Sequence, residues 1–268
     1  MIKHLTRIKT GLLLGIFTII SVFYFPHLVF AGLTWIIISA AFWEWLSLIA
    51  IRIFFHKVLL MLIFWMMMLV MQHNTLLTLE LAAVWWAMAA VMVFIPLVRL
   101  QTLKHRWIQF IIGLFVLAPT WVSMVELHTE SRIGVFYLIM LVCFADTGAY
   151  FVGTRCGQHK LLPRISPKKS VEGLVGGLIV GSIAGMSMVF LMPHPKSLSY
   201  LLIWFVAGLV LILISVLGDF FESMIKRLYE VKDSGSLLPG HGGFLDRLDS
   251  LSSAFPIYVL GCFLFHIF

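Results

Sequence analysis

Long apolar runs separated by short polar segments dominate the pattern of this chain. A membrane-spanning helix needs about 20 mostly apolar residues. Nine segments meet or approach that length: 11–25, 27–50, 58–72, 76–98, 107–126, 133–153, 173–193, 199–222 and 251–268. The pattern therefore predicts an all-α, polytopic integral membrane protein with about nine transmembrane helices.

The first apolar segment has a second interpretation. Residues 11–25 follow Lys3, Arg7 and Lys9, and a basic stretch before an apolar run is also typical of a cleaved signal peptide. Because another long apolar segment begins directly after Pro26, we expect the first one to be retained as a membrane helix.

Composition excludes a water-soluble fold. Hydrophobic residues make up 61% of the chain and charged residues 12%, whereas soluble domains have about 45–50% and about 25%. So few polar residues cannot cover a globule in water. The cysteines Cys143, Cys156 and Cys262 form no CxxC pair, so neither a disulfide framework nor a zinc site is indicated.

Positive charge gathers on one side of the predicted helices. If the N-terminus is cytoplasmic, 17 of the 19 Lys and Arg residues fall in cytoplasmic segments, and only Arg132 and Lys196 fall outside. Since basic residues near spans stay in the cytoplasm, the net charge of +7 reflects topology. The basic residues are dispersed over five segments, so we expect no nucleic-acid partner.

Polar chemistry is unevenly distributed along the chain. All five Asp residues lie in the second half. We therefore expect residues 1–130 to form a membrane scaffold, and residues 131–268 to form the catalytic region with cytoplasmic loops 154–172 and 226–250, within one continuous membrane domain. Glu44 lies within the second predicted span. A carboxylate inside a membrane span is, by default, a candidate functional residue. The position of Glu44 between two Trp residues favours instead a neutral or interfacial side chain.

The first candidate cluster begins at Asp146, at the end of an apolar run. The loop beyond it carries Arg155, Lys160, Arg164, Lys168 and Lys169, and it contains Ser166 and Pro167 shortly before a helix is expected to open near Glu172. Cations, hydroxyls and free backbone N–H groups at a helix N-terminus are suited to binding phosphates. An ordinary positive-inside loop is the alternative interpretation.

The second cluster follows the eighth predicted span. If the helix continues past residue 222, Asp219, Glu222, Ser223 and Lys226 lie along one face at i, i+3, i+4 and i+7. Asp246 and Asp249 share a face if the ninth helix begins near them. Asp219, Asp246 and Asp249 can then converge from two helix ends.

These residue types indicate phosphate chemistry. Carboxylates without Cys and with few His are ligands suited to Mg²⁺. Mg²⁺ together with Lys and Arg is typical of phosphoryl or nucleotidyl transfer, which depends on charge neutralisation and in-line positioning. His241, Gly242 and Gly243 add backbone N–H groups that an anion can approach closely. A polar loop with purely structural ion pairs is the alternative.

Two motifs carry a family resemblance. The stretch Ser223-x2-Lys226-Arg227-x4-Lys232-Asp233-x-Gly235-x2-Leu238-Pro239-x-His241-Gly242-Gly243-Phe244-x-Asp246-Arg247-Leu248-Asp249 resembles the signature of phosphatidate cytidylyltransferases, also called CDP-diacylglycerol synthases. The blocks 145–153 and 165–173 are similar to the same family. Mild departures occur near the second motif, at Cys156, Gln158 and Ser170.

The resemblance implies a reaction and roles for the motif residues. The reaction is phosphatidate + CTP → CDP-diacylglycerol + pyrophosphate, with CTP and phosphatidate as partners and Mg²⁺ as cofactor. By resemblance, Asp219, Asp246 and Asp249 bind Mg²⁺; Lys226, Arg227 and Arg247 hold phosphates; Ser166, Pro167, Lys168 and Lys169 close over a phosphate; His241 belongs to the catalytic set; and Asp146, Ser223, Asp233, Gly242 and Gly243 contact substrate.

Two other functions are weighed against this one. A CTP-dependent polyprenol-type lipid kinase would transfer the γ-phosphoryl group. A secondary transporter would predict inverted repeats and charges near the bilayer midplane, and the sequence has neither. We expect a bacterial inner membrane location with the active site facing the cytoplasm. The sequence does not determine the oligomeric state, and a homodimer is compatible with it.

Overall fold

The described part of the chain folds into α-helices. A computed structural model describes residues 2–190, 197–235, 237 and 242–267, without the side chains of residues 2–10, 97 and 98. Within these residues the elements are α1 (Ile2–Tyr24), α2 (His27–Leu48), α3 (Phe54–His73), α4 (Thr75–Phe94), the 3₁₀ helix η1 (Leu97–Lys104), α5 (Arg106–Glu130), α6 (Arg132–Cys156), α7 (Val171–Val189), α8 (Leu198–Leu228) and α9 (Leu245–Leu264).

Each of the nine predicted spans overlaps one of these α-helices. Seven of the described helices, α2 to α8, are long and apolar enough to cross a membrane. The other two are α1, whose described apolar part is the shorter stretch Gly11–Tyr24, and α9, which begins with charged residues. The all-α polytopic architecture is therefore confirmed, and the count of nine membrane spans stays a prediction.

Several helix boundaries differ from the predicted spans, and the C-terminal ends of α4 and α8 are two of them. Helix α4 ends at Phe94 instead of residue 98, because Ile95 takes an extended conformation before Pro96, which has no N–H to donate. Helix α8 continues to Leu228, well past residue 222. The charged stripe that begins at Asp219 is therefore helical, as predicted.

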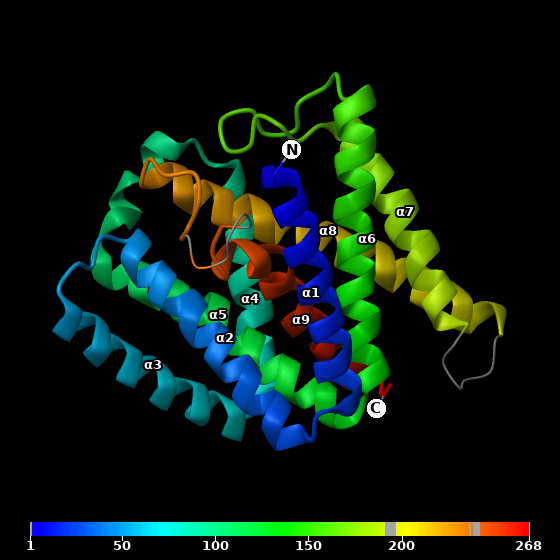
Figure 1. Ribbon diagram of the computed structural model, residues 1–268, viewed down its shortest axis with the longest axis horizontal. Helices are drawn as coiled ribbons and strands as arrows, with labels where there is room; N and C mark the ends of the chain where they lie inside the picture. Colours follow the sequence, from blue (N-terminus) through cyan, green and yellow to red (C-terminus); the bar gives the residue numbers. More distant parts are fainter. Residues whose placement is uncertain (1, 191–196, 236, 238–241, 268) are drawn as a thin grey trace.

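Helix α9 lies at the centre of the assembly. It packs against α8, α5 and α4 and also contacts α2 and α6 (Figure 1). Its residues Ala254 and Phe255 are fully buried. Since α2, α4 and α5 belong to residues 1–130, the predicted scaffold packs directly on the helix that carries Asp246 and Asp249.

Helices α8 and α9 approach each other closely at Gly218. A Cβ atom on this residue would overlap the carbonyl oxygen of Asp249 and the hydroxyl of Ser253. The Ser253 hydroxyl donates a hydrogen bond of 2.8 Å to the carbonyl of Ile214 on α8. A glycine is required for this approach. Because Asp219 follows Gly218 directly, the contact places its backbone beside the first turns of α9.

A second close contact joins α6 and α7. A Cβ atom on Gly148 would lie 2.7 Å from the carbonyl oxygen of Gly176. The outer faces of the two helices carry exposed apolar side chains, among them Tyr150, Ile179 and Ile183. Such surfaces are compatible with contact to lipid. The tight pairing holds the two helix ends that flank the loop of residues 157–170.

The chain ends lie at opposite ends of the assembly. Figure 1 shows the N-terminus and the loop between α6 and α7 at one end, and the C-terminus at the other. This arrangement agrees with the predicted topology, in which the N-terminus and that loop share one side of the membrane.

Candidate active site

A cavity of about 260 Å³ lies where α6, α7 and α8 meet the loop of residues 157–170. Four charged side chains that the sequence singles out line it: Asp146, Lys168, Lys169 and Asp219. The other lining residues are Ala149, Tyr150, Gly153, Thr154, Leu161, Ser170, Gly173, Leu174 and Val216. The fold therefore brings the loop motif and the α8 stripe to one cavity, although they are far apart in the chain.

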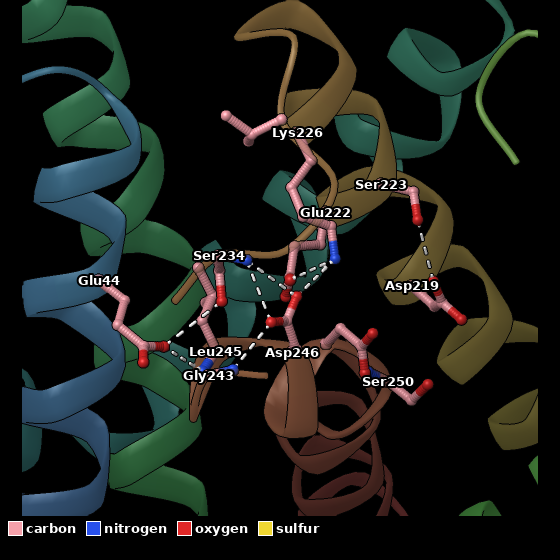
Figure 2. Close-up of polar contacts among 12 residues, drawn as sticks. Glu44, Asp219, Glu222, Ser223, Lys226, Ser234, Gly243, Leu245, Asp246 and Ser250 are labelled. Atoms are coloured by element: carbon pink, nitrogen blue, oxygen red, sulfur yellow. Dashed lines mark hydrogen bonds and ion pairs between the residues drawn. The ribbon is translucent and has the colours of Figure 1, made fainter. Parts of the chain in front are cut away.

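Lys169 and Asp219 form an ion pair at this cavity. The Nζ atom of Lys169 lies 2.5 Å from Oδ2 of Asp219 and 4.5 Å from the centroid of the Phe220 ring. The Ser223 hydroxyl donates a hydrogen bond of 3.2 Å to Oδ1 of Asp219 (Figure 2). The side chains of Lys169 and Asp219 are 28% and 24% exposed, so a ligand in the cavity can reach both.

Arg227 ties the loop to the end of α8. Its Nε donates a hydrogen bond of 3.3 Å to the carbonyl of Ile165, and its Nη1 donates one of 3.0 Å to the carbonyl of Val231. On the far side of the loop, the Ser170 hydroxyl accepts a hydrogen bond from the Gly173 amide at 3.1 Å and caps α7. Hydrogen bonds therefore fix the loop at Ile165 in its interior and at Ser170 where it enters α7.

Three carboxylates from three helices lie within electrostatic range of one another. They are Asp146 on α6, Asp219 on α8 and Asp249 on α9. Lys169 and Arg247 lie close enough to Asp146 to interact with its charge. Like charges gathered in this way repel one another unless a cation or a proton compensates them.

The side chains of these carboxylates are of the type that binds metal ions such as Mg²⁺. Within the described ranges, no three His, Cys, Asp or Glu side chains converge closely enough to hold a metal ion by themselves. Mg²⁺, however, is usually bound through one or two carboxylates and completed by water and substrate phosphates. Asp219 and Asp249 provide hard oxygen donors of that kind, so the donor set fits Mg²⁺ shared with a phosphate ligand.

Lys226 lies between two carboxylates. Its Nζ atom is 3.0 Å from Oε1 of Glu222 and 2.8 Å from Oδ1 of Asp246 (Figure 2). Lys226 is 7% exposed. A buried ammonium group shared by two carboxylates has less positive charge to offer a phosphate than Lys168 or Lys169. The cations that line the cavity are therefore on the loop.

Asp246 fixes the segment that leads into α9. Its Oδ2 accepts hydrogen bonds from the amides of Gly243 at 3.0 Å and Ser234 at 3.1 Å, while its Oδ1 pairs with Lys226. Gly242 adopts a φ of 78°, a left-handed conformation that favours glycine. These contacts organise the surrounding segment, and the role of Asp246 as a metal ligand stays a prediction.

The comparison with known proteins gives the family of the chain. Residues 5–265 match the model of the cytidylyltransferase family. The chain belongs to this family.

Several relatives of this cytidylyltransferase are similar over most of its length. It is 35% identical over 257 residues to a phosphatidate cytidylyltransferase of Pseudomonas aeruginosa, covering 94% of each chain. It is 32% identical over 265 residues to one of Bacillus subtilis, covering 96% of each chain. It is 37% identical over 200 residues to one of Haemophilus influenzae, covering 70% of this chain and 68% of the relative.

The remaining predicted site residues of this cytidylyltransferase are spread more widely. Pro167 on the loop, Asp233 beyond α8 and Arg247 on α9 are exposed, whereas Ser166 is half-buried. His241 lies outside the described residues. For Ser166, Pro167, Asp233 and Arg247, the role in ligand binding stays a prediction.

Glu44 lies inside the protein. It is 3% exposed, so its side chain contacts other parts of the chain. Its Oε2 accepts hydrogen bonds from the amide of Leu245 at 2.9 Å and from the hydroxyl of Ser234 at 3.4 Å (Figure 2). The sequence contains one signal for these contacts: a carboxylate is rare within a membrane span, and Glu44 lies in one.

Proposed function

We propose that this protein is a phosphatidate cytidylyltransferase, which transfers CMP from CTP to phosphatidate and releases CDP-diacylglycerol and pyrophosphate. Membership of the cytidylyltransferase family and the names of its relatives support this assignment. The charged cavity supplies the groups that such a reaction requires.

The observation that carries the proposal is the amphipathic surface around the cavity. An apolar cavity of about 400 Å³ shares Leu161, Leu174 and Val216 with the charged one. Its other lining residues are Ala90, Val93, Phe94, Leu162, Val210, Leu213, Ile214, Leu217 and Phe220. A substrate with a phosphate head and acyl chains matches a charged pocket that continues into an apolar groove. A water-soluble phosphate ester would have no use for the groove.

The chemical step needs little from the protein beyond charge and position. A phosphate oxygen of phosphatidate forms a bond to the α-phosphorus of CTP, and the bond from that phosphorus to the bridging oxygen of the β-phosphate breaks. Pyrophosphate leaves with that electron pair. No general base is required, because the attacking phosphate is already an anion near neutral pH. Lys168 and Lys169 would neutralise the phosphates and hold them in line.

We propose Asp219 and Asp249 as the principal carboxylates toward Mg²⁺, with Asp146 next to them. A bound Mg²⁺ would neutralise phosphate oxygens and orient the leaving group. Asp246, also expected as a ligand from the sequence, would act mainly by holding Lys226 and the start of α9.

We further propose that the protein lies in a bacterial inner membrane with the cavity open to the cytoplasm. The apolar helices and the bacterial relatives support the membrane location. The distribution of Lys and Arg supports the orientation, because both Lys168 and Lys169 lie on the side that the positive-inside rule assigns to the cytoplasm.

Product analysis with purified protein tests the proposed function. Phosphatidate, CTP and Mg²⁺ in detergent micelles should yield CDP-diacylglycerol and pyrophosphate in equal amounts, as measured by mass spectrometry and a pyrophosphate assay. Replacing phosphatidate by diacylglycerol should give no lipid product. Release of CDP, or turnover of diacylglycerol, would contradict the proposal.

A further inference from the structure

Glu44 is a buried carboxylate on α2, in the half of the chain that carries neither sequence motif. Burying a carboxylate is unfavourable unless hydrogen bonds compensate it. Its compensating partners are Ser234, which follows α8, and Leu245, the first residue of α9. Glu44 therefore links two residues that lie more than 180 positions away from it in the chain.

Two glycines lie directly beside this carboxylate. A Cβ atom on Gly235 would overlap Oε1 of Glu44, and a Cβ atom on Gly243 would overlap Oε2. Glycine at both positions lets the backbone approach the carboxylate closely. The fit is thus both polar, through Ser234 and Leu245, and steric, through the two glycines.

Two residues beside Glu44, Ser234 and Gly243, also bind Asp246. The Ser234 amide and the Gly243 amide both donate hydrogen bonds to its carboxylate, and Asp246 in turn binds Lys226 (Figure 2). Ser234 thus contacts Glu44 through its hydroxyl and Asp246 through its amide. A shift of the Glu44 side chain would therefore also shift the start of α9. That movement would displace Asp249, which lies within electrostatic range of Asp219.

We propose that Glu44 is a positioning residue for the transfer reaction: it fixes Ser234 and Leu245 relative to each other, so that the two carboxylates at the start of α9, Asp246 and Asp249, keep their positions beside α8. This inference rests on the proposed function. It gives the N-terminal helices a role beyond that of a membrane scaffold, because α2 supplies the anchor.

Substitutions of Glu44 test the inference. Only Oε2 has partners among the described residues, so Glu44→Gln can supply the same acceptor and should retain kcat within about threefold. Glu44→Ala should lower kcat at least about tenfold, with a smaller change in the KM for CTP. Glu80→Ala, which removes an exposed carboxylate on α4, is the matched control and should leave kcat unchanged.

Glu44→Asp covers the case in which Glu44→Ala does not fold. Its side chain is shorter by one methylene, which withdraws the carboxylate from the Leu245 amide, so the loss in kcat should persist in protein purified at wild-type yield. A wild-type kcat in Glu44→Asp would overturn the inference. A loss in Glu44→Gln as large as that in Glu44→Ala would also overturn it.

A double-mutant cycle tests the steric part. Gly243→Ala should lower kcat in the wild-type background, because its Cβ meets the carboxylate. In the Glu44→Ala background the same change should cost much less, since the overlapping atoms are gone. Equal losses in both backgrounds would overturn the inference. Wild-type protein without cytidylyl transfer would instead overturn the proposed function, so the two failures are distinguishable.

Discussion

The Nζ atom of Lys169, on the loop between α6 and α7, lies 2.5 Å from the Oδ2 atom of Asp219 on α8. The ion pair joins the two candidate clusters predicted from the sequence, because Lys169 belongs to the first and Asp219 to the second. Each partner is about one-quarter exposed, which is compatible with the phosphate and Mg²⁺ binding that we propose for this cavity. A ligand can therefore exchange with this pair without unfolding the loop.

Removal of Lys169 should weaken catalysis without unfolding the protein. We expect Lys169→Ala to lower kcat/KM for CTP by about tenfold or more, because a phosphate-facing cation is lost. Steady-state kinetics in micelles measure this. Lys160→Ala is the matched control, since Lys160 is exposed on the same loop and does not line the cavity. Equal kinetics in the two variants would show that Lys169 does not bind phosphate and that its charge serves only to keep the loop in the cytoplasm.

The carboxylates proposed for Mg²⁺ should be sensitive to loss of charge alone. Asp219→Asn and Asp249→Asn keep the side-chain size, and each should lower kcat by at least about 100-fold. Titration with Mg²⁺ should show partial recovery at high concentration. Glu80→Gln, an exposed site on α4, should behave like wild type. Unchanged turnover in both Asp variants would remove these residues from the metal site.

Filling the apolar groove should affect only the lipid substrate. Ala90 on α4 lines the groove, and Ala90→Phe should raise the KM for phosphatidate several-fold while the KM for CTP stays the same. Surface-dilution kinetics separate the two constants. Ala87→Phe adds the same bulk at an exposed position of α4 outside the groove. If the two variants have the same phosphatidate KM, acyl chains do not occupy this groove.

Much of the fold follows from the sequence because lipid imposes long apolar helices. The start of α9 near Asp246 and the continuation of α8 past Glu222 are also predictable, since a regular spacing of charged residues on a helix face marks both. The partners of Glu44 and Lys226 are not predictable in this way. They depend on how α2, α8 and α9 pack, and no local pattern encodes a contact between Glu44 and Leu245.

The orientation is open to direct labelling. In a background without Cys143, Cys156 and Cys262, a cysteine at position 160 should react with a membrane-impermeant reagent only after the inner membrane is permeabilised. A cysteine at position 131, at the opposite helix ends, should react before permeabilisation. The reverse pattern would show that the cavity does not face the cytoplasm.

The position of the label transferred from CTP tests the central claim most directly. Purified wild-type protein would be incubated with phosphatidate, Mg²⁺ and CTP labelled at either the α- or the γ-phosphate, and the lipid and aqueous phases would be counted. We expect the α-label to enter the lipid and the γ-label to be recovered in pyrophosphate. Transfer of the γ-label to lipid would identify a lipid kinase, and no label in lipid from either CTP would contradict the assignment of a cytidylyltransferase.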